Sequence, residues 1–192
     1  MKNVINIAVI GLGQIGSYLL NELNQKKKDI ELKTGKQIKV VGISAKNKNK
    51  KRKFKLNKKI FFNNPFDIFK KNHVDIMFEC IGFSDGISKK MVEFALNNKC
   101  HVITPNKALI SKHGDNLSLL AEKNMVNLEF EASVAGGIPI LRTIKEGLAT
   151  NKINKIYGIL NGTSNYILSE MEKKNETFVN VLKKAQLLGY AE

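Results

Sequence analysis

The sequence predicts an α/β protein with a doubly wound parallel sheet, because short apolar segments alternate along the chain with segments of helical spacing. The distances between these segments suit right-handed crossovers. A glycine-rich turn directly after the first apolar segment supports the same fold class, and the pattern changes near residue 132. We therefore expect a sheet domain over residues 1–132, followed over 133–192 by the incomplete beginning of an α+β domain.

The first 132 residues contain five apolar segments that we expect to be strands and three amphipathic segments that we expect to be helices. In the first expected helix the apolar residues recur at three- and four-residue intervals, which is typical of a helix with one buried face. The expected strands are 6–10, 38–43, 75–81, 101–104 and 126–132, and the expected helices are 15–23, 87–96 and 117–122.

Beyond residue 132 a turn of small residues precedes Pro139, and proline is favoured at the first position of a helix. We expect helices over 140–148, 163–171 and 178–188, with Gly189 ending the last of them. Residues 153–160 alternate like a half-buried strand. About 60 residues are too few for a comfortable independent core.

The composition indicates a globular protein, since 192 residues with 43% hydrophobic content can bury one core and part of a second. No apolar stretch approaches the roughly 18 residues of a membrane span, and the N-terminal segment lacks the features of a secretory signal. We expect a cytoplasmic protein without membrane contact. Cys80 and Cys100 lie in or beside apolar segments, so we expect buried thiols rather than a disulfide.

The formal net charge of +15 is concentrated in one segment. Residues 46–59 hold nine basic residues and no acid, and without them the net charge would be +6. A solvated loop explains this run, and so does a contribution to phosphate binding. A nucleic-acid-binding segment is the third alternative, but the run has only Phe54 for base stacking. We therefore expect no nucleic-acid partner.

The glycine-rich turn has the GxGxxG spacing of dinucleotide-binding folds. The first glycine permits a tight turn, the second lets backbone N–H groups approach a diphosphate, and the third allows the helix to pack close to the strand. A purely structural turn would also contain glycines, but this one joins a strand to an amphipathic helix, whose N-terminus attracts phosphate. We interpret residues 1–132 as a Rossmann-type NAD(P)-binding domain with a turn formed by Gly11, Leu12, Gly13, Gln14, Ile15 and Gly16.

The end of the second expected strand favours NADP over NAD. An acid at this place would bind the ribose 2′-hydroxyl of NAD, but residues 44–48 contain lysines and no acid. Cations suit a 2′-phosphate, and Lys46 is the first candidate. The alternative is that Lys46 only begins the solvated loop, so NAD stays possible.

Three further sequence motifs suggest a ligand-binding site. Thr104-Pro105-Asn106-Lys107 brings a lysine to the carboxyl edge of the sheet, where it is either a cationic clamp or an ordinary surface residue. Residues 131–139 combine Glu131, on an apolar strand, with a glycine turn whose carbonyl groups suit a hard cation. Residues 158–166 leave a strand through a polar turn that is either part of a site or an ordinary helix cap.

Together with Leu188-Gly189-Tyr190-Ala191-Glu192, these motifs resemble homoserine dehydrogenase in their order and spacing. That enzyme interconverts aspartate 4-semialdehyde and homoserine in the biosynthesis of threonine, methionine and isoleucine. The resemblance extends from residue 4 to residue 192. It implies an NAD(P)-dependent oxidoreductase that acts on a small-molecule substrate. It also implies that the full-length enzyme is a homodimer.

The resemblance also implies roles for individual residues. Lys107 would contact the cofactor and the reacting centre, and Ile81 and Gly82 would lie along the cofactor. A sodium ion would be bound by Glu131 and the carbonyl groups of Val134, Gly136 and Ile138. The amino acid would be held by Gly162, Thr163, Tyr190 and Glu192, with Glu192 facing its ammonium group.

The residue types agree with this chemistry, because a lysine can stabilise or protonate the oxygen that gains charge when hydride attacks an aldehyde. In the family the main proton-donating lysine and a neighbouring aspartate lie beyond the Gly-Tyr-x-Glu string, and this chain stops at Glu192. We therefore expect a piece that binds cofactor with reduced affinity and has little or no turnover.

Two other classes compete with this interpretation. Another two-domain dehydrogenase, such as an aspartate-semialdehyde or dihydrodipicolinate enzyme, would share the cofactor fold. An acylating aldehyde dehydrogenase needs a cysteine beside a base, but Cys100 and His101 are neighbours on a strand and point to opposite faces. A non-enzymatic cofactor- or nucleic-acid-binding module would leave Lys107 and Glu131 unexplained.

Overall fold

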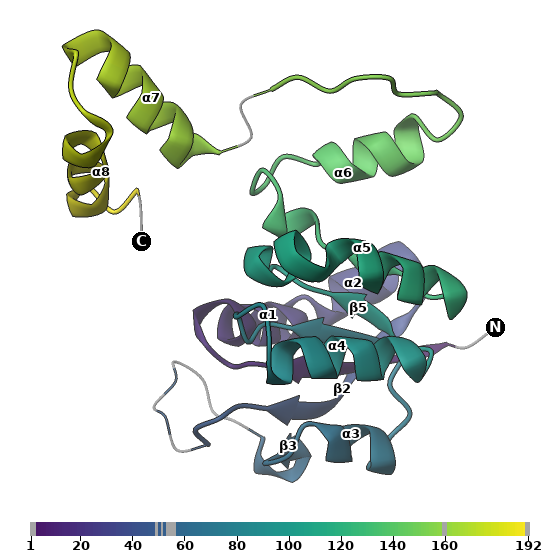
Figure 1. Cartoon of the computed structure of the whole chain (residues 1–192). Coiled ribbons are helices and arrows are strands. Elements are labelled where there is room, and N and C mark those ends of the chain that lie inside the picture. The colour runs from purple at the N-terminus through teal and green to yellow at the C-terminus, as the bar shows by residue number, and fades with distance from the viewer. Residues whose placement is uncertain (1–2, 49, 51, 53–56, 159–160, 191–192) are drawn as a thin grey trace. The chain divides into compact units, whose positions relative to one another are not determined.

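The computed structural model describes residues 3–48, 50, 52, 57–158 and 161–190 (Figure 1). It contains two compact units, Met1–Gly136 and Gly137–Glu192, and each unit is described by itself. None of the described helices is both long and apolar enough to cross a membrane.

The first unit contains a six-stranded parallel sheet with the strand order β3-β2-β1-β4-β5-β6. This is the Rossmann order, so the predicted doubly wound fold is confirmed. The order reverses between β1 and β4, and ligands bind at the carboxyl ends of the strands that flank such a reversal. The strands are β1 (Val4–Ile10), β2 (Gln37–Ser44), β3 (Phe61–Phe62), β4 (Ile76–Glu79), β5 (His101–Ile103) and β6 (Leu128–Glu129).

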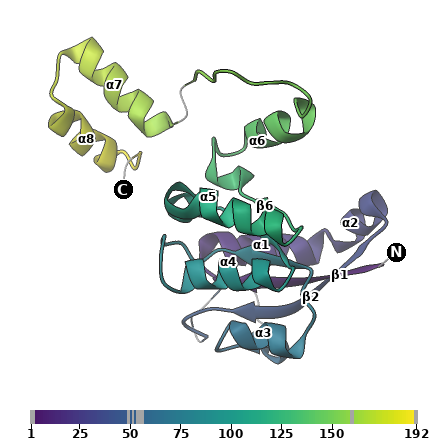
Figure 2. The same cartoon turned by 45° about the vertical axis from the view of Figure 1, so that its right-hand side comes forward.

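Helices cover both faces of the sheet, as the uninterrupted apolar run of β1 requires. Ala8 and Ile10 face one core cluster, whereas Ile7 and Val9 face the other, because successive side chains of a strand alternate. Figure 2 shows α4 and α5 side by side. The helices of this unit are α1 (Gln14–Gln25), α2 (Lys27–Thr34), α3 (Phe66–Lys71), α4 (Ile87–Asn97) and α5 (Lys107–Lys123).

Three expectations for the first unit need correction. The helix expected over 117–122 begins ten residues earlier, because the Asn106 side chain caps it by accepting a hydrogen bond from Leu109 N at 3.1 Å. The strand expected over 126–132 is shorter than predicted, because only Leu128 and Glu129 of β6 pair with β5. Glu131 therefore does not lie on a strand but begins a short 3₁₀ helix, Glu131–Ser133.

In its described residues the second unit contains helices joined by irregular segments. The helices are α6 (Ile140–Arg142), a π-helical continuation over Thr143–Gly147, α7 (Gly162–Lys174) and α8 (Phe178–Leu187). The centre of its small core is formed by Ile167, Val181 and Ala185. Gly189 ends α8 as expected, with φ +74°, while the N–H groups of Gly189 and Tyr190 bond back to Gln186 O and Ala185 O.

The strand expected over 153–160 is wrong for residues 153–158, which are irregular and exposed. The remaining two residues of that prediction lie outside the described residues. A strand needs a neighbouring strand for its backbone hydrogen bonds, and the described part of the second unit offers residues 153–158 no such neighbour.

Candidate functional site

The turn between β1 and α1 lies tightly against the end of β4. Gly11 has φ +94°, and a Cβ atom there would lie 2.4 Å from the carbonyl carbon of Cys80 and 2.6 Å from Ile81 N. Gly11 N also donates to Ser44 O of β2 at 2.9 Å. The ends of three neighbouring strands are therefore fixed together at the reversal of strand order.

The other two glycines of the motif differ sharply in their surroundings. A Cβ atom on Gly16 would lie 1.9 Å from Gly11 O, so close packing demands glycine there. A Cβ atom on Gly13 would meet nothing within 4 Å. Gly13 precedes α1, whose N-terminus has no side-chain cap and no acid in its first turn. Open space at an uncapped, positively polarised helix end fits a diphosphate.

The connection after β4 runs beside this turn. Gly82 has φ +81° and Phe83 has φ +72°, so the backbone turns through two successive left-handed residues. Ile81 N donates to Glu79 Oε1 at 2.8 Å, which fixes the start of the connection. The structure thus brings Ile81 to Gly11, as the predicted cofactor site requires.

Lys107 is the exposed first residue of α5, directly after the buried cap residue Asn106. Asn106 Nδ2 donates to Phe83 O at 2.9 Å, which joins the start of α5 to the connection after β4. Lys107 therefore lies at the carboxyl edge of the sheet, next to the residue that is hydrogen-bonded to the connection after β4.

Sequence reasoning missed Glu79, Asn106 and Arg52. Glu79 lies within an apolar strand segment, and Asn106 is one polar residue of the Thr104-Pro105-Asn106-Lys107 motif, in which Lys107 is the evident candidate. Arg52 was one of nine basic residues in a run, yet its Nε donates to Leu12 O at 3.3 Å and its Nη2 to Asn47 O at 2.9 Å. A signal was present, since Arg52 is the one arginine of the run and its guanidinium suits several carbonyl groups at once.

Lys46 is exposed two residues beyond β2, whose last residue is bonded to Gly11. Lys46 and Arg52 thus both belong to the segment that leaves β2 beside the glycine turn. Whether either contacts a cofactor phosphate stays a prediction.

Two of the expected substrate residues come together within the second unit. The Thr163 hydroxyl donates to Tyr190 O, and the rings of Tyr166 and Tyr190 pack edge to face at 5.1 Å between centroids. Gly162 begins α7, which Asn161 caps through Ser164 N at 2.9 Å. Glu192 lies outside the described residues.

Comparisons with known proteins agree with this architecture. Residues 11–131 match the family described as homoserine dehydrogenase, NAD binding domain, and residues 139–192 match the family described as homoserine dehydrogenase. The chain belongs to the homoserine dehydrogenase family.

Similar proteins carry the same family name. The chain is 41% identical to the homoserine dehydrogenase of Neisseria gonorrhoeae and 38% identical to that of Bacillus subtilis, over 98% of its own length and 43% of theirs. A homoserine dehydrogenase structure from Thiobacillus denitrificans has a TM-score of 0.79 at 39% identity, with 98% of this chain and 43% of that one covered. The chain thus spans less than half the length of these relatives.

The cation site expected from the likeness to homoserine dehydrogenase stays a prediction. Gly136 has φ +62° and belongs to the first unit, whereas Ile138 belongs to the second. Val134 follows the 3₁₀ helix, and its N–H donates to Glu131 O at 3.1 Å. In the described part of the chain no three side chains of His, Cys, Asp or Glu gather as metal ligands. A cation would therefore depend on backbone carbonyl groups and the single carboxylate of Glu131.

The two cysteines are free thiols, as predicted, but only Cys100 is buried, whereas Cys80 is partly exposed. Burial raises the pKa of Cys80 to about 12, helped by the nearby charge of Glu79. Burial likewise raises the pKa of Cys100 to about 12, with a smaller contribution from Asp75. Both thiols are protonated at neutral pH, so neither suits the nucleophile of an acylating dehydrogenase.

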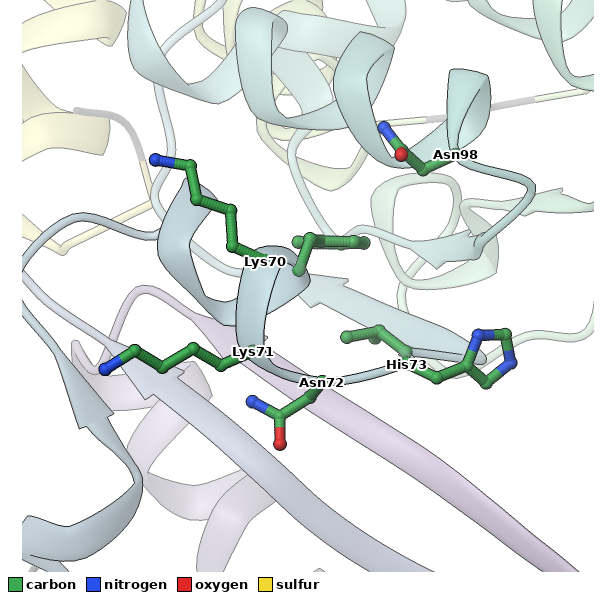
Figure 3. Close-up of a pocket in the computed structure, with 7 residues that line it drawn as sticks. Lys70, Lys71, Asn72, His73 and Asn98 are labelled. Atoms are coloured by element: carbon green, nitrogen blue, oxygen red, sulfur yellow. The ribbon is translucent and has the colours of Figure 1, made fainter.

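An open hollow of about 380 Å³ lies at the opposite edge of the sheet, near the amino ends of β4 and β5 (Figure 3). Its polar groups are engaged with their neighbours. Lys70 Nζ lies 2.8 Å from Asp67, and Lys71 Nζ lies 5.8 Å from the centre of the Phe62 ring. The residues that line the hollow precede β4 and β5, whereas the glycine turn follows β1. The hollow is therefore separate from the candidate site at the carboxyl edge.

Proposed function

We propose that the first unit binds NADP across the carboxyl ends of β1 and β4. The observation that carries this proposal is the open space at Gly13, at the uncapped N-terminus of α1 and beside the end of β4. Backbone N–H groups there can approach a diphosphate without a side chain in the way. The adenosine half would then lie toward β2 and the nicotinamide half toward β4 and β5.

The preference for NADP over NAD rests on the charge of the segment after β2. Lys46 is exposed there, and Arg52 is held over the glycine turn by its contact with Leu12 O. Its Nη2 donates to Asn47 O at 2.9 Å, and its Nη1 donates to Lys50 O at 3.0 Å and to Lys48 O at 3.4 Å. A phosphate is a stronger acceptor than these exposed carbonyl groups, so the guanidinium would exchange them for the 2′-phosphate.

The reaction that we propose for the whole enzyme is the interconversion of aspartate 4-semialdehyde and homoserine. The bound cofactor supplies or accepts a hydride. Lys107, exposed at the start of α5, would stabilise the oxygen that becomes negative as the carbonyl is reduced. The second unit would contribute substrate contacts through Gly162, Thr163, Tyr190 and Glu192. A cation at residues 131–138 and a homodimeric whole enzyme complete this proposal.

Titration with NADPH and NADH, followed by reduced-nicotinamide fluorescence, tests the cofactor proposal. Replacing Lys46 and Lys48 together by alanine, or Arg52 by alanine, should weaken NADPH binding roughly 10-fold or more and leave NADH binding unchanged, because lost charge-assisted hydrogen bonds affect only the phosphorylated cofactor.

The matched control is the pair Lys70→Ala and Lys71→Ala, which removes the same charge at the opposite edge of the sheet. This pair should leave both affinities unchanged. An equal loss for NADPH and NADH in the Lys46 and Lys48 variant would overturn the 2′-phosphate assignment, and no saturable binding of either cofactor to the wild type would overturn the proposed function.

A further inference from the structure

The carboxylate of Glu79 is completely buried at the end of β4. Its two oxygens accept hydrogen bonds from three donors that belong to two different connections of the sheet. Oε1 accepts from Ile81 N at 2.8 Å, and Oε2 accepts from the Thr104 hydroxyl at 2.6 Å and from Asn106 Nδ2 at 3.3 Å. Only a group with acceptor capacity on both atoms satisfies all three.

Asn106 extends this network in both directions. Its Nδ2 also donates to Phe83 O at 2.9 Å and to Ser88 Oγ at 3.0 Å, and its Oδ1 caps the first turn of α5. The Thr104 hydroxyl accepts from Asn106 N at 3.1 Å. Glu79 is therefore the centre of a network that joins the connection after β4 to the residue immediately before Lys107.

Burying the Glu79 carboxylate costs desolvation free energy that an apolar side chain of similar size would not cost. A buried carboxylate is expensive unless it is well hydrogen-bonded, and no ion pair joins Glu79 to a lysine, arginine or histidine within the described residues. The network also holds Phe83 in a left-handed conformation, φ +72°, although this apolar residue is 78% exposed. An apolar residue at position 79 would fill the core but take the acceptor away from Ile81 N and the Thr104 hydroxyl, whereas Asn106 Nδ2 would keep Phe83 O and Ser88 Oγ.

We propose that Glu79 is a positioning residue for the nicotinamide half of the cofactor site, and this inference rests on the proposed function. It fixes the backbone of Ile81–Phe83, which would lie along that half, and through Thr104 and Asn106 it fixes the start of α5 that carries Lys107. Glu79 itself is buried and touches neither cofactor nor substrate.

The substitution Glu79→Gln tests this role, because glutamine keeps the shape and gives up the acceptor on one atom. The probes are NADPH, which occupies both halves of the site, and adenosine 2′,5′-bisphosphate, which occupies only the adenosine half. Glu79→Gln should weaken NADPH binding about 10-fold or more while the bisphosphate affinity changes less than about two-fold, as expected for one lost buried hydrogen bond to a charged group. Glu93→Gln is the matched control and should change neither, because Glu93 is a half-exposed acid of α4 whose partner is Lys89, with Lys89 Nζ at 3.6 Å.

A second variant covers the case in which Glu79→Gln fails to fold. Thr104→Val removes the hydroxyl between Glu79 and Asn106 and should give the same split between the two probes. Unchanged NADPH affinity in either folded variant, or an equal loss for both probes, would overturn the positioning role. If the wild type bound neither probe, the proposed function would fall and this inference with it, so the two failures are distinguishable.

Discussion

The two units differ in how completely they bury their own apolar residues. In the first unit both faces of the sheet are covered, and Met77, Met91 and Leu117 are almost fully buried. Among the described residues of the second unit, Ile167, Val181 and Ala185 form the buried core, while Ile156, Leu168 and Leu187 are at least 61% exposed. The candidate cofactor site is therefore held by a complete framework, whereas the expected substrate residues lie on elements that few internal contacts support.

Truncating one core residue in each unit should give the largest changes in stability. Met77→Ala should destabilise the first unit by roughly 2–5 kcal/mol and weaken NADPH binding, because Met77 lies at the centre of the sheet. Val181→Ala should cost about 1.5 kcal/mol within the second unit and leave NADPH binding unchanged. Denaturant titration with NADPH fluorescence as a second readout measures both, and a large loss of NADPH binding in Val181→Ala would contradict the separation of the units.

Alanine at two glycines of the β1–α1 turn should separate the packing role of one glycine from the binding role of the other. Gly16→Ala should cost about 1–3 kcal/mol, because its Cβ atom would lie 1.9 Å from Gly11 O. Gly13→Ala meets open space and should cost less, roughly 1 kcal/mol or below for a changed helix cap, yet lower NADPH affinity about 10-fold. Thermal unfolding and NADPH titration separate the two effects, and normal NADPH binding by Gly13→Ala would remove the diphosphate from this turn.

The pH dependence of stability is a test confined to alkaline solution, because the two thiols affect stability only above about pH 9. Burial raises the pKa of both Cys80 and Cys100 to about 12, above the ordinary value of 9.0. Unfolded thiols ionise from about pH 9 while the folded ones stay protonated, so stability is full below pH 9 and falls by roughly 1.4 kcal/mol per thiol and pH unit toward pH 12.

The control for the pH effect is the variant with alanine at both Cys80 and Cys100. Urea unfolding at pH 8 and pH 10 should show a smaller loss of stability for this variant than for the wild type. Equal losses in the two proteins would show that the two thiols do not contribute.

The sheet and the glycine turn were predictable from the sequence because they leave local signals. An apolar run bounded by glycine predicts β1 and its turn, and three-and-four spacing predicts α1 and α4. α2 was missed, since its eight residues contain no buried side chain and hence no apolar stripe. β3 was missed because two paired residues leave no alternation to detect.

The contacts that organise the candidate site were less predictable. Asn106 looks like any polar residue after a strand, and Glu79 looks like an interruption of an apolar one, until the fold brings them within 3.3 Å of each other. Residues 153–158 show the opposite error, because alternation predicts a strand without showing whether a neighbour exists to pair with it.

Amide hydrogen exchange with and without NADPH tests most directly whether the cofactor lies across the ends of β1 and β4. We predict that NADPH slows exchange in residues 11–16 and 81–83 and leaves residues 70–74, which line the hollow at the opposite edge, unchanged. Slower exchange at residues 70–74 with no change at the glycine turn would contradict this account of the site.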